Sequence, residues 1–294
     1  MVGREIVKDG KLNPESSNYR NHIPLVIITP TSGVASLRLR DLWEYRELLY
    51  FMVWRDVKGR YRQMAFGPLW IMIAPIIQMV LYSVLFGVVF GLPSEGIAYP
   101  IFVYVALLPW QFFSSAARQS SGSLVSQQHI ISKVYFPRLL IPISSIFAAF
   151  IDFLASFLVL MGMMVVFRVP LTWTVSTLPL FLLIAGGLGL GIGLWLAGLA
   201  VKYHDVNIAV GFGIDIWKYA TPVAYSVTLI PQQYLNLYFL NPMAVVVEGF
   251  RWALLGTTGP PVWSILVAIF TVTITLISGA FFFRRIERTI VDLI

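Results

Sequence analysis

The sequence predicts an all-α polytopic membrane protein with six transmembrane helices. Of its 294 residues, 58% are hydrophobic and only 12% are charged, whereas soluble domains carry about 25% charged residues. The 32 residues from 63 to 94 contain no charged side chain, and about 20 apolar residues of helix suffice to cross a bilayer core. Because only helices and closed barrels satisfy their backbone polar groups in hydrocarbon, repeated apolar stretches of this length indicate transmembrane helices.

The first 37 residues are predicted to form a cytoplasmic tail. They are polar and mixed in charge up to residue 21, and the apolar run at residues 23–29 is short and interrupted by Pro24. This run does not fit a cleavable signal peptide. Residues 23–36 hold β-forming residues broken by proline and glycine, so we expect an extended segment.

Residues 38–62 are predicted to form an amphipathic helix that lies in the membrane interface. Glu44, Glu47, Arg55 and Lys58 fall on one helical stripe, and apolar residues with the same 3.6-residue period fall on another. A surface helix of a soluble domain is the alternative, but this helix runs directly into the first span. The interface residues that we select are Trp54, Arg55, Lys58, Arg60 and Arg62.

Residues 63–294 are predicted to form one transmembrane domain. Its six spans are expected at about 66–90, 98–119, 141–167, 177–201, 207–226 and 262–283. Fourteen Lys and Arg residues lie near the span ends on the side of the amino terminus, and two lie on the opposite side. Because basic residues near span ends favour the cytoplasm, both termini are predicted to be cytoplasmic in a multi-pass plasma membrane protein.

The segment between the fifth and sixth spans, residues 227–261, is too apolar for a simple loop and too rich in proline for a span. Two half-length helices that re-enter the outer leaflet fit it better, because irregular backbone at that depth must be sheltered by protein or a water-filled cavity. This segment is therefore our candidate for an external gate. Its key residues are Asn241, Pro242, Glu248 and Arg251, of which the last two are three apart and can pair on one helix face.

Several classes of function are excluded by what the sequence lacks. No GxxxxGK[ST] motif is present, so the chain does not bind ATP in a P-loop. The three histidines are far apart, no cysteine occurs, and no acidic cluster suggests a metal or catalytic site. The net charge of +7 comes from basic residues at span ends, where they set topology and meet lipid headgroups, rather than from a nucleic-acid surface.

Three charged residues inside predicted spans admit two interpretations. Asp152 stands in the third span, and Asp215 and Lys218 share a helix face in the fifth, where they could neutralise one another. A proton-coupled carrier would use such groups as a relay. The interpretation we favour is that Asp152 bonds a neighbouring helix and that the charged residues of the fifth span lie near its cytoplasmic end, because a relay needs several carboxylates close together.

Aromatic residues inside or near spans form the predicted substrate channel. Their faces stack on sugar rings, and Tyr and Trp also offer hydrogen-bonding groups, although most such residues in membrane proteins serve packing or the interface. The channel residues that we select are Tyr82, Tyr104, Trp110, Phe112, Tyr219 and Tyr225.

Three strings resemble the permease subunit of ABC-2 type exporters. They are WRDVKGRYRQMAFGPLWIMIAP at 54–75, IISKVYFPRLLIP at 130–142 and NLYFLNPMAVVVEGFRWAL at 236–254. In their order along the chain and their positions relative to the spans, these strings are most similar to those of the branch that exports lipid-linked polysaccharides such as O-antigen across the bacterial inner membrane. The resemblance covers about residues 35–290.

The resemblance implies a homodimer that pairs with two separately encoded ABC ATPase subunits, which bind ATP and Mg. The chain itself would then be a transport subunit and not an enzyme, with no cofactor of its own. Residues 127–138 resemble the short coupling helix that contacts the ATPase, although Gln127, Gln128 and His129 depart from the family pattern, as does His204. The residues that match this string are Lys133, Val134, Tyr135, Phe136, Pro137 and Arg138.

Other functions remain open at the level of sequence. An ABC-2 exporter of teichoic acid, capsule polymer, lipid or drug would share the same strings. A membrane-embedded glycosyltransferase or ligase would need grouped carboxylates or arginines on an outer loop, where only Glu248 and Arg251 occur. An ion-coupled carrier would need broken helices in both halves, and the sequence suggests them only near the carboxyl end.

Overall fold

The computed structural model describes residues 43–61, 67, 69–131, 136–203 and 205–293. All regular structure in these residues is helical, which confirms the predicted all-α class. The predicted tail, residues 1–37, lies outside the described residues. The helices, in chain order, are α2 (Arg46–Tyr61), α3 (Leu69–Tyr82), the π-helix η2 (Ser83–Val89), α4 (Tyr99–Ser126), α5 (Gln128–Ile131), α6 (Leu140–Val166), η3 (Trp173–Thr177), α7 (Leu178–Lys202), α8 (Val206–Tyr219), η4 (Val227–Leu229), α9 (Gln232–Tyr238), α10 (Pro242–Leu255) and α11 (Val262–Leu293).

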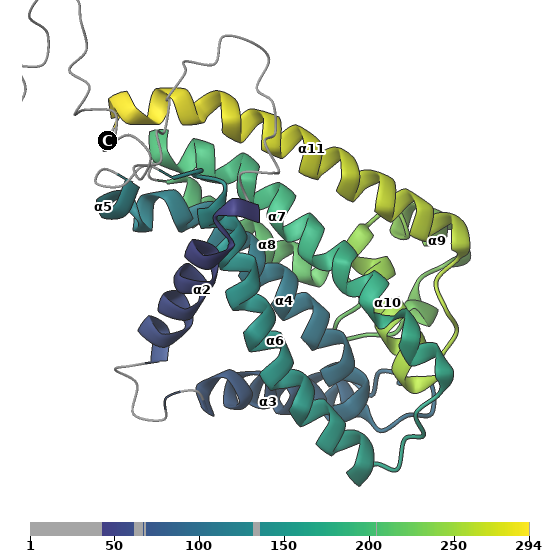
Figure 1. Ribbon diagram of the computed structural model, residues 1–294. Helices are drawn as coiled ribbons and strands as arrows, with labels where there is room; N and C mark the ends of the chain where they lie inside the picture. The colour runs from purple at the N-terminus through teal and green to yellow at the C-terminus, as the bar shows by residue number, and fades with distance from the viewer. Residues whose placement is uncertain (1–42, 62–66, 68, 132–135, 204, 294) are drawn as a thin grey trace, which may run out of the picture. The chain divides into compact units, whose positions relative to one another are not determined.

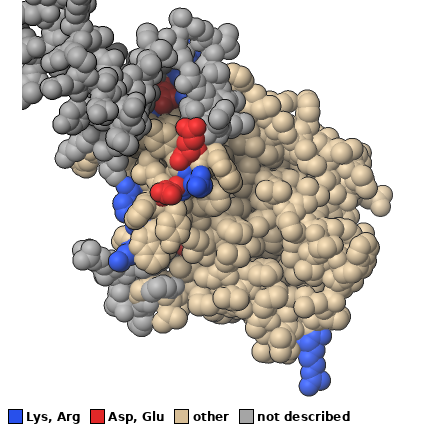
Figure 2. Space-filling model, viewed as in Figure 1, with Lys and Arg blue, Asp and Glu red and all other residues tan. Residues whose placement is uncertain are grey.

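Five helical stretches are long and apolar enough to cross a membrane. They are Leu69–Val89, Tyr99–Ser126, Leu140–Val166, Trp173–Lys202 and Val262–Glu287. Figure 2 agrees with this assignment, because charged side chains gather near one end of the visible face and most of the rest carries none. The chain is therefore an integral membrane protein.

The predicted fifth span, 207–226, is not among these five. In its place α8 has 14 residues and ends at Tyr219, so at 1.5 Å per residue it is about 21 Å long. Pro222 follows shortly after, and proline disfavours helical backbone in the residue before it and cannot continue the hydrogen-bond ladder. The turn that replaces the last third of the predicted span contains the residues that α10 later holds in place.

Helix α4 is the centre of the bundle. Nearly all of its first half is fully buried, and α6, α7, α10 and α3 pack around it. In Figure 1, α9 and α10 lie at the opposite end of the bundle from α5. Helix α11 runs along α7 on the outer flank.

Small residues allow α7 to approach α4 closely. A Cβ atom added at Gly193 of α7 would lie 2.3 Å from the Cβ of Ser120 on α4. Close approach of helix backbones is a main source of packing energy in membranes, where lipid is as apolar as the side chains. The glycine-rich pattern of the fourth span thus serves packing within the bundle.

We predict that Gly193→Ala destabilises the protein and that Gly162→Ala does not. The added methyl group at residue 193 must displace α4, and overpacking costs roughly 1–3 kcal/mol. At Gly162 on α6 an added Cβ meets no atom within 4 Å, so this variant is the matched control. Thermal unfolding of both variants in the same lipid nanodiscs measures the difference, and equal melting temperatures would contradict the packing argument.

Candidate functional site

The site is built on α10 and begins with its amino-terminal cap. The Asn241 side chain accepts a hydrogen bond from the Met243 backbone N–H at 3.0 Å, and Pro242 occupies the first helical position, where its missing N–H costs nothing. Asn241 also accepts from the Trp217 indole at 3.1 Å and donates to the Ala220 carbonyl at 3.2 Å. The cap therefore joins the start of α10 to the end of α8.

Helix α10 is short and almost wholly buried, and it carries a buried ion pair. The Arg251 Nη1 atom lies 2.7 Å from Glu248 Oε1, and the arginine side chain has 0% exposure. The guanidinium carbon lies 3.7 Å from the centroid of the Phe102 ring. At the other end of α10, Gly256 adopts a left-handed conformation with φ of +71°, which ends the helix at low cost because glycine lacks a Cβ.

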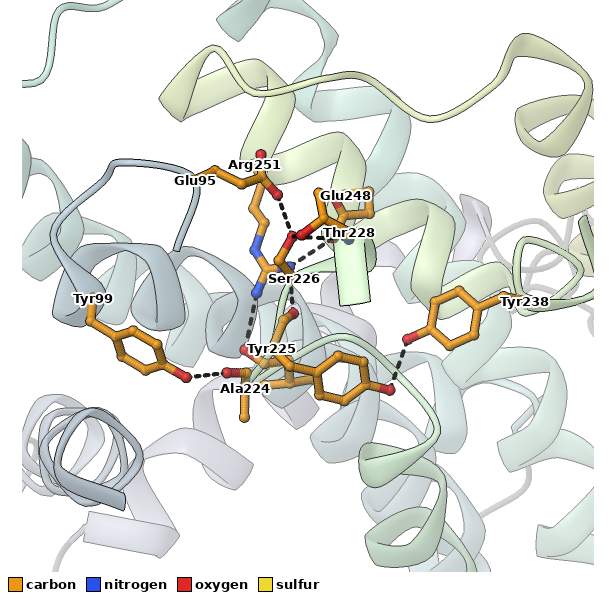
Figure 3. Close-up of polar contacts among 10 residues, drawn as sticks. Glu95, Tyr99, Ala224, Tyr225, Ser226, Thr228, Tyr238, Glu248 and Arg251 are labelled. Carbon is orange, nitrogen blue, oxygen red and sulfur yellow. Dashed lines mark hydrogen bonds and ion pairs between the residues drawn. The ribbon is translucent and has the colours of Figure 1, made fainter. Parts of the chain in front are cut away.

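Arg251 also holds the chain that follows α8. It donates to the carbonyl of Tyr225 at 3.1 Å and to that of Val223 at 3.2 Å (Figure 3). These carbonyls belong to a turn with no helical partner for them, and a buried carbonyl without a donor is costly. One guanidinium therefore satisfies a carboxylate and two backbone groups.

Two other elements fasten the same turn. The Ser226 hydroxyl donates to Glu95 Oε1 at 2.5 Å, and the Tyr99 hydroxyl donates to the Ala224 carbonyl at 2.5 Å (Figure 3). The hydroxyls of Tyr225 and Tyr238 lie 3.0 Å apart, which links the turn to α9. Residues 223–226 are thus held by α10, α9, the first residue of α4 and the loop before it. We call this set of contacts the α10 clasp.

The ionisation of the clasp follows from its burial. Burial raises the pKa of the Glu248 carboxyl, and the charge and hydrogen bond of Arg251 act against that rise. Burial lowers the pKa of Arg251, and Glu248 opposes that change. Since a guanidinium keeps its proton in proteins, Glu248 serves as its counter-ion. Burial and the Tyr225 hydrogen bond raise the pKa of Tyr238, which therefore stays a neutral phenol.

Sequence analysis selected Asn241, Pro242, Glu248 and Arg251 but missed the other members of the α10 clasp. Glu95, Tyr99 and Tyr238 complete the clasp from other elements. Of these three residues, only Glu95 could have been singled out from the sequence, because it is the one acidic residue between the first two predicted spans. The carbonyls of Val223 and Tyr225 are backbone groups, so the residue types at these positions do not identify them as partners of Arg251.

Helix α2 packs against α6 through polar contacts that the predicted stripes did not include. Arg60 lies 2.5 Å from Asp152 and donates to Gln119 at 2.9 Å. The predicted inter-helix bond of Asp152 is therefore present. Arg55 pairs with Asp56 at 2.8 Å, next along the chain.

The exposed surface of α2 carries aromatic side chains as well as charged ones. Trp54 is exposed, and the Lys58 ammonium lies 5.8 Å from the centroid of its ring. Met52 of the same helix, in contrast to Trp54, is buried. Arg62 lies outside the described residues. An exposed tryptophan beside a lysine suits a membrane–water boundary.

The structure describes only part of the predicted coupling helix. Lys133, Val134 and Tyr135 lie outside the described residues, and the described helix here, α5, spans only Gln128–Ile131. Phe136 is buried within the chain, in a cluster with Met52 and Phe283. The sequence could not show this because the residues that cover Phe136 come from α2 and α11.

Arg138 is likewise held within the chain. It donates from Nη1 to the Glu287 carbonyl at 2.7 Å, and its backbone N–H lies 3.4 Å from the carboxylate of the same residue. Pro137, which precedes it, is half-buried. The end of the predicted coupling segment is thus tied to the carboxyl-terminal part of α11.

Four of the six predicted channel residues are buried: Tyr82 of α3, and three residues of α4 that are packed inside the bundle. Tyr104 is fully buried and donates to the Ser156 carbonyl at 3.1 Å. Trp110 and Phe112 are buried among other aromatic rings. These three side chains are core residues by their packing, because α4, which carries them, is central rather than peripheral.

The two charged residues of the predicted fifth span, which share a helix face, are not paired with each other in the structure. Asp215 lies 2.5 Å from Arg118 on α4, not beside Lys218. The Lys218 ammonium lies instead over the rings of Tyr82 and Tyr219, at 5.5 and 5.8 Å from their centroids. Helical spacing permitted the Asp215–Lys218 pair, but an arginine from another helix takes the carboxylate.

We predict that Arg251→Leu lowers the free energy of unfolding by about 3–5 kcal/mol, because it leaves Glu248 buried without a counter-ion. The matched control is Arg55→Leu, which breaks the partly exposed pair with Asp56 and should cost no more than about 1 kcal/mol. Thermal unfolding in nanodiscs measures both. A loss at Arg251 no larger than at Arg55 would mean that the clasp does not stabilise the fold.

Comparison with known proteins places this architecture in a family. Residues 47–255 match the family described as ABC-2 type transporter. The chain is 29% identical over 217 residues to the O-antigen export system permease protein RfbA of Myxococcus xanthus, covering 72% of this chain and 82% of that protein. It is 27% identical over 251 residues to RfbA of Klebsiella pneumoniae, covering 84% and 95%. It is 24% identical over 249 residues to the polysialic acid transport protein KpsM of Escherichia coli, covering 80% and 91%. Because the family match spans more than half of a chain built from long apolar helices, this protein belongs to the ABC-2 type transporter family.

Proposed function

We propose that the chain is the transmembrane subunit of an ATP-driven exporter, and that two copies form a channel for a lipid-linked, O-antigen-like polysaccharide across the bacterial inner membrane. Family membership and relatives named for O-antigen export support this proposal. Export of a capsule-type polymer is the second candidate, favoured by the relative named for polysialic acid transport. Teichoic acid, lipid and drug export stay as further alternatives within the family.

The observation that carries the proposal is the exposed face of α8, where a charged residue and a tyrosine lie among apolar side chains such as Ile208 and Phe212. Only Val210 and Ile214 of this helix are buried, whereas the Asp215 side chain is 61% exposed and Tyr219 is 68% exposed. Charged groups inside a membrane face a bundle interior or water rather than lipid. A second copy of the chain, with a water-filled path between the copies, would cover this face.

In this proposal, the pathway is lined by Tyr82, Tyr219 and Tyr225, the selected aromatic residues that lie around the end of α8. A polymer cannot be enclosed in a pocket, so it needs a continuous path along which no site binds it tightly. Tyrosine rings stack weakly on sugar rings and offer hydroxyls at their edge, which suits a sliding chain. The core residues Tyr104, Trp110 and Phe112 would support this wall from behind.

The external gate in this proposal is the segment 227–261, of which η4, α9 and α10 are the helical parts. The α10 clasp ties it to the turn after α8, so a movement of α8 during transport would reach the gate through Arg251. In the closed state of this proposal, the clasp would hold residues 223–226 in one conformation, because α10, α9 and the loop before α4 all bond to them.

Coupling to ATP hydrolysis is assigned to the opposite end of the bundle. ABC-2 membership implies association with an ABC ATPase, which would bind ATP and Mg. We assign the contact to residues 127–138 and to α2, and we place both termini in the cytoplasm on the charge count. An ion-coupled carrier is less well supported, because Asp152 and Asp215 each pair with an arginine.

The first test asks whether α8 crosses the membrane. The chain has no cysteine, so Gln232→Cys and Tyr203→Cys each give a single labelling site in an exposed position. We expect an impermeant maleimide to label Gln232→Cys on intact spheroplasts and Tyr203→Cys only after permeabilisation. Labelling of both from the same side would show that α8 does not cross and would remove the six-span arrangement.

The second test asks whether residues 127–138 couple the chain to an ATPase. We expect Tyr135→Ala to abolish export of the surface polysaccharide while the ABC ATPase still hydrolyses ATP, because an aromatic anchor carries much of the energy of such a contact. Trp173→Ala, at the opposite end and highly exposed, is the control and should export normally. Failure of any ABC ATPase to co-purify with the wild-type chain would overturn the proposal.

A further inference from the structure

Lys218, near the end of α8, has an environment that the export mechanism above does not explain. Its ammonium lies over the rings of Tyr82 and Tyr219. The neighbouring acid, Asp215, is engaged by Arg118 at 2.5 Å, and Glu95 accepts from Ser226. Within the described part of the chain, no carboxylate lies within ion-pair distance of Lys218.

A cavity of about 130 Å³ opens beside this ammonium. Aromatic side chains from α3 and η2 form one wall, and the turn after α8 forms the other. That turn is the one that Arg251 holds through the carbonyls of Val223 and Tyr225. The cavity therefore combines one cation with aromatic faces, next to the candidate gate.

The chemistry of these groups selects a class of ligand. Two aromatic rings offset part of the cost of a charge in the membrane, but they leave the N–H donors of the ammonium available to an anionic oxygen. Charged groups inside membranes are costly and generally functional. Rings beside the ammonium can meanwhile stack on the apolar face of a sugar.

We propose that Lys218, Tyr82 and Tyr219 form a subsite for an acidic sugar residue of the transported chain, one that carries a carboxylate or a phosphate. Lysine suits a passing ligand, because its ammonium is a point charge on a flexible stem, whereas arginine holds anions in a rigid bidentate grip. The subsite gives the pathway a preference for acidic polymers at the point where they reach the gate. This inference rests on the proposed export function, since it takes the ligand to be the exported chain.

The test measures how fast Lys218 reacts with a water-soluble acetylating reagent in the full-length protein. The protein is held in phosphatidylcholine nanodiscs, and mass spectrometry reads the acetylation of each lysine. The probes are an oligogalacturonate and a neutral maltooligosaccharide of equal length, with a third arm in phosphatidylglycerol nanodiscs without sugar. Lys202 is the internal control. Its ammonium also lies beside an aromatic ring, 5.2 Å from the Tyr203 ring centroid, but Lys202 does not line this cavity.

We expect the oligogalacturonate to slow acetylation of Lys218 and not of Lys202, and the neutral sugar to slow neither. In a parallel assay with fluorescent oligogalacturonate, Lys218→Gln should bind about tenfold more weakly, as expected for one lost charge-assisted hydrogen bond. Lys218→Arg, which keeps the charge, should retain most of the affinity. The labelling assay uses the unmodified chain, so its result does not depend on whether a variant folds. In the binding assay, Lys218→Arg serves as the folding control.

Three results would overturn the inference. They are equal slowing by the neutral sugar, protection by phosphatidylglycerol alone, which would assign the site to lipid, and unchanged binding by Lys218→Gln. The assay contains no ATPase and no gradient, so it reads the subsite whatever the topology and coupling tests return. Normal export together with no acidic-sugar binding would remove the subsite and leave the proposed function standing.

Discussion

The buried guanidinium of Arg251 is the interaction on which the arrangement around α8 and α10 depends. It meets Glu248 on its own helix and two carbonyls in the turn after α8. A buried chain that leaves a helix exposes carbonyls that nothing local can satisfy, and in an apolar environment each of them is costly. Arg251 supplies the missing donors. The chain can therefore end α8 early and turn while still inside the protein.

This early end has consequences for the surface of the bundle. Because α8 is short, it buries only Val210 and Ile214, with Trp217 partly buried against the core, and most of its other side chains lie on the surface. Asp215 and Tyr219 are exposed there, among apolar residues such as Phe212, and Lys218 is half-buried beside them. The same constraint that closes the turn creates the face that we assign to transport.

Asp152 of α6 and Asp215 of α8 follow one rule. Asp152 pairs with Arg60 of α2, and Asp215 pairs with Arg118 of α4. In each case the arginine comes from a distant part of the chain, so the pair joins two helices as well as neutralising the acid. The partly buried Arg60–Asp152 pair stabilises the assembled bundle, since breaking it leaves a charge without a partner, whereas the exposed Arg118–Asp215 pair contributes less. They leave little for a proton relay to use.

The sequence by itself determined the helical class, five of the six predicted spans and the start of α10. These features depend on run lengths of apolar residues and on the local Asn241–Pro242 cap, and both are legible along the chain. The Glu248–Arg251 pair was also legible, because residues three apart share a helix face. Only the tertiary structure decided that Phe136 and Tyr104 are core residues, that Arg118 takes Asp215, and that Arg251 binds two carbonyls. Each of these depends on which helices become neighbours, and a backbone carbonyl or a covered side chain leaves no mark in the sequence.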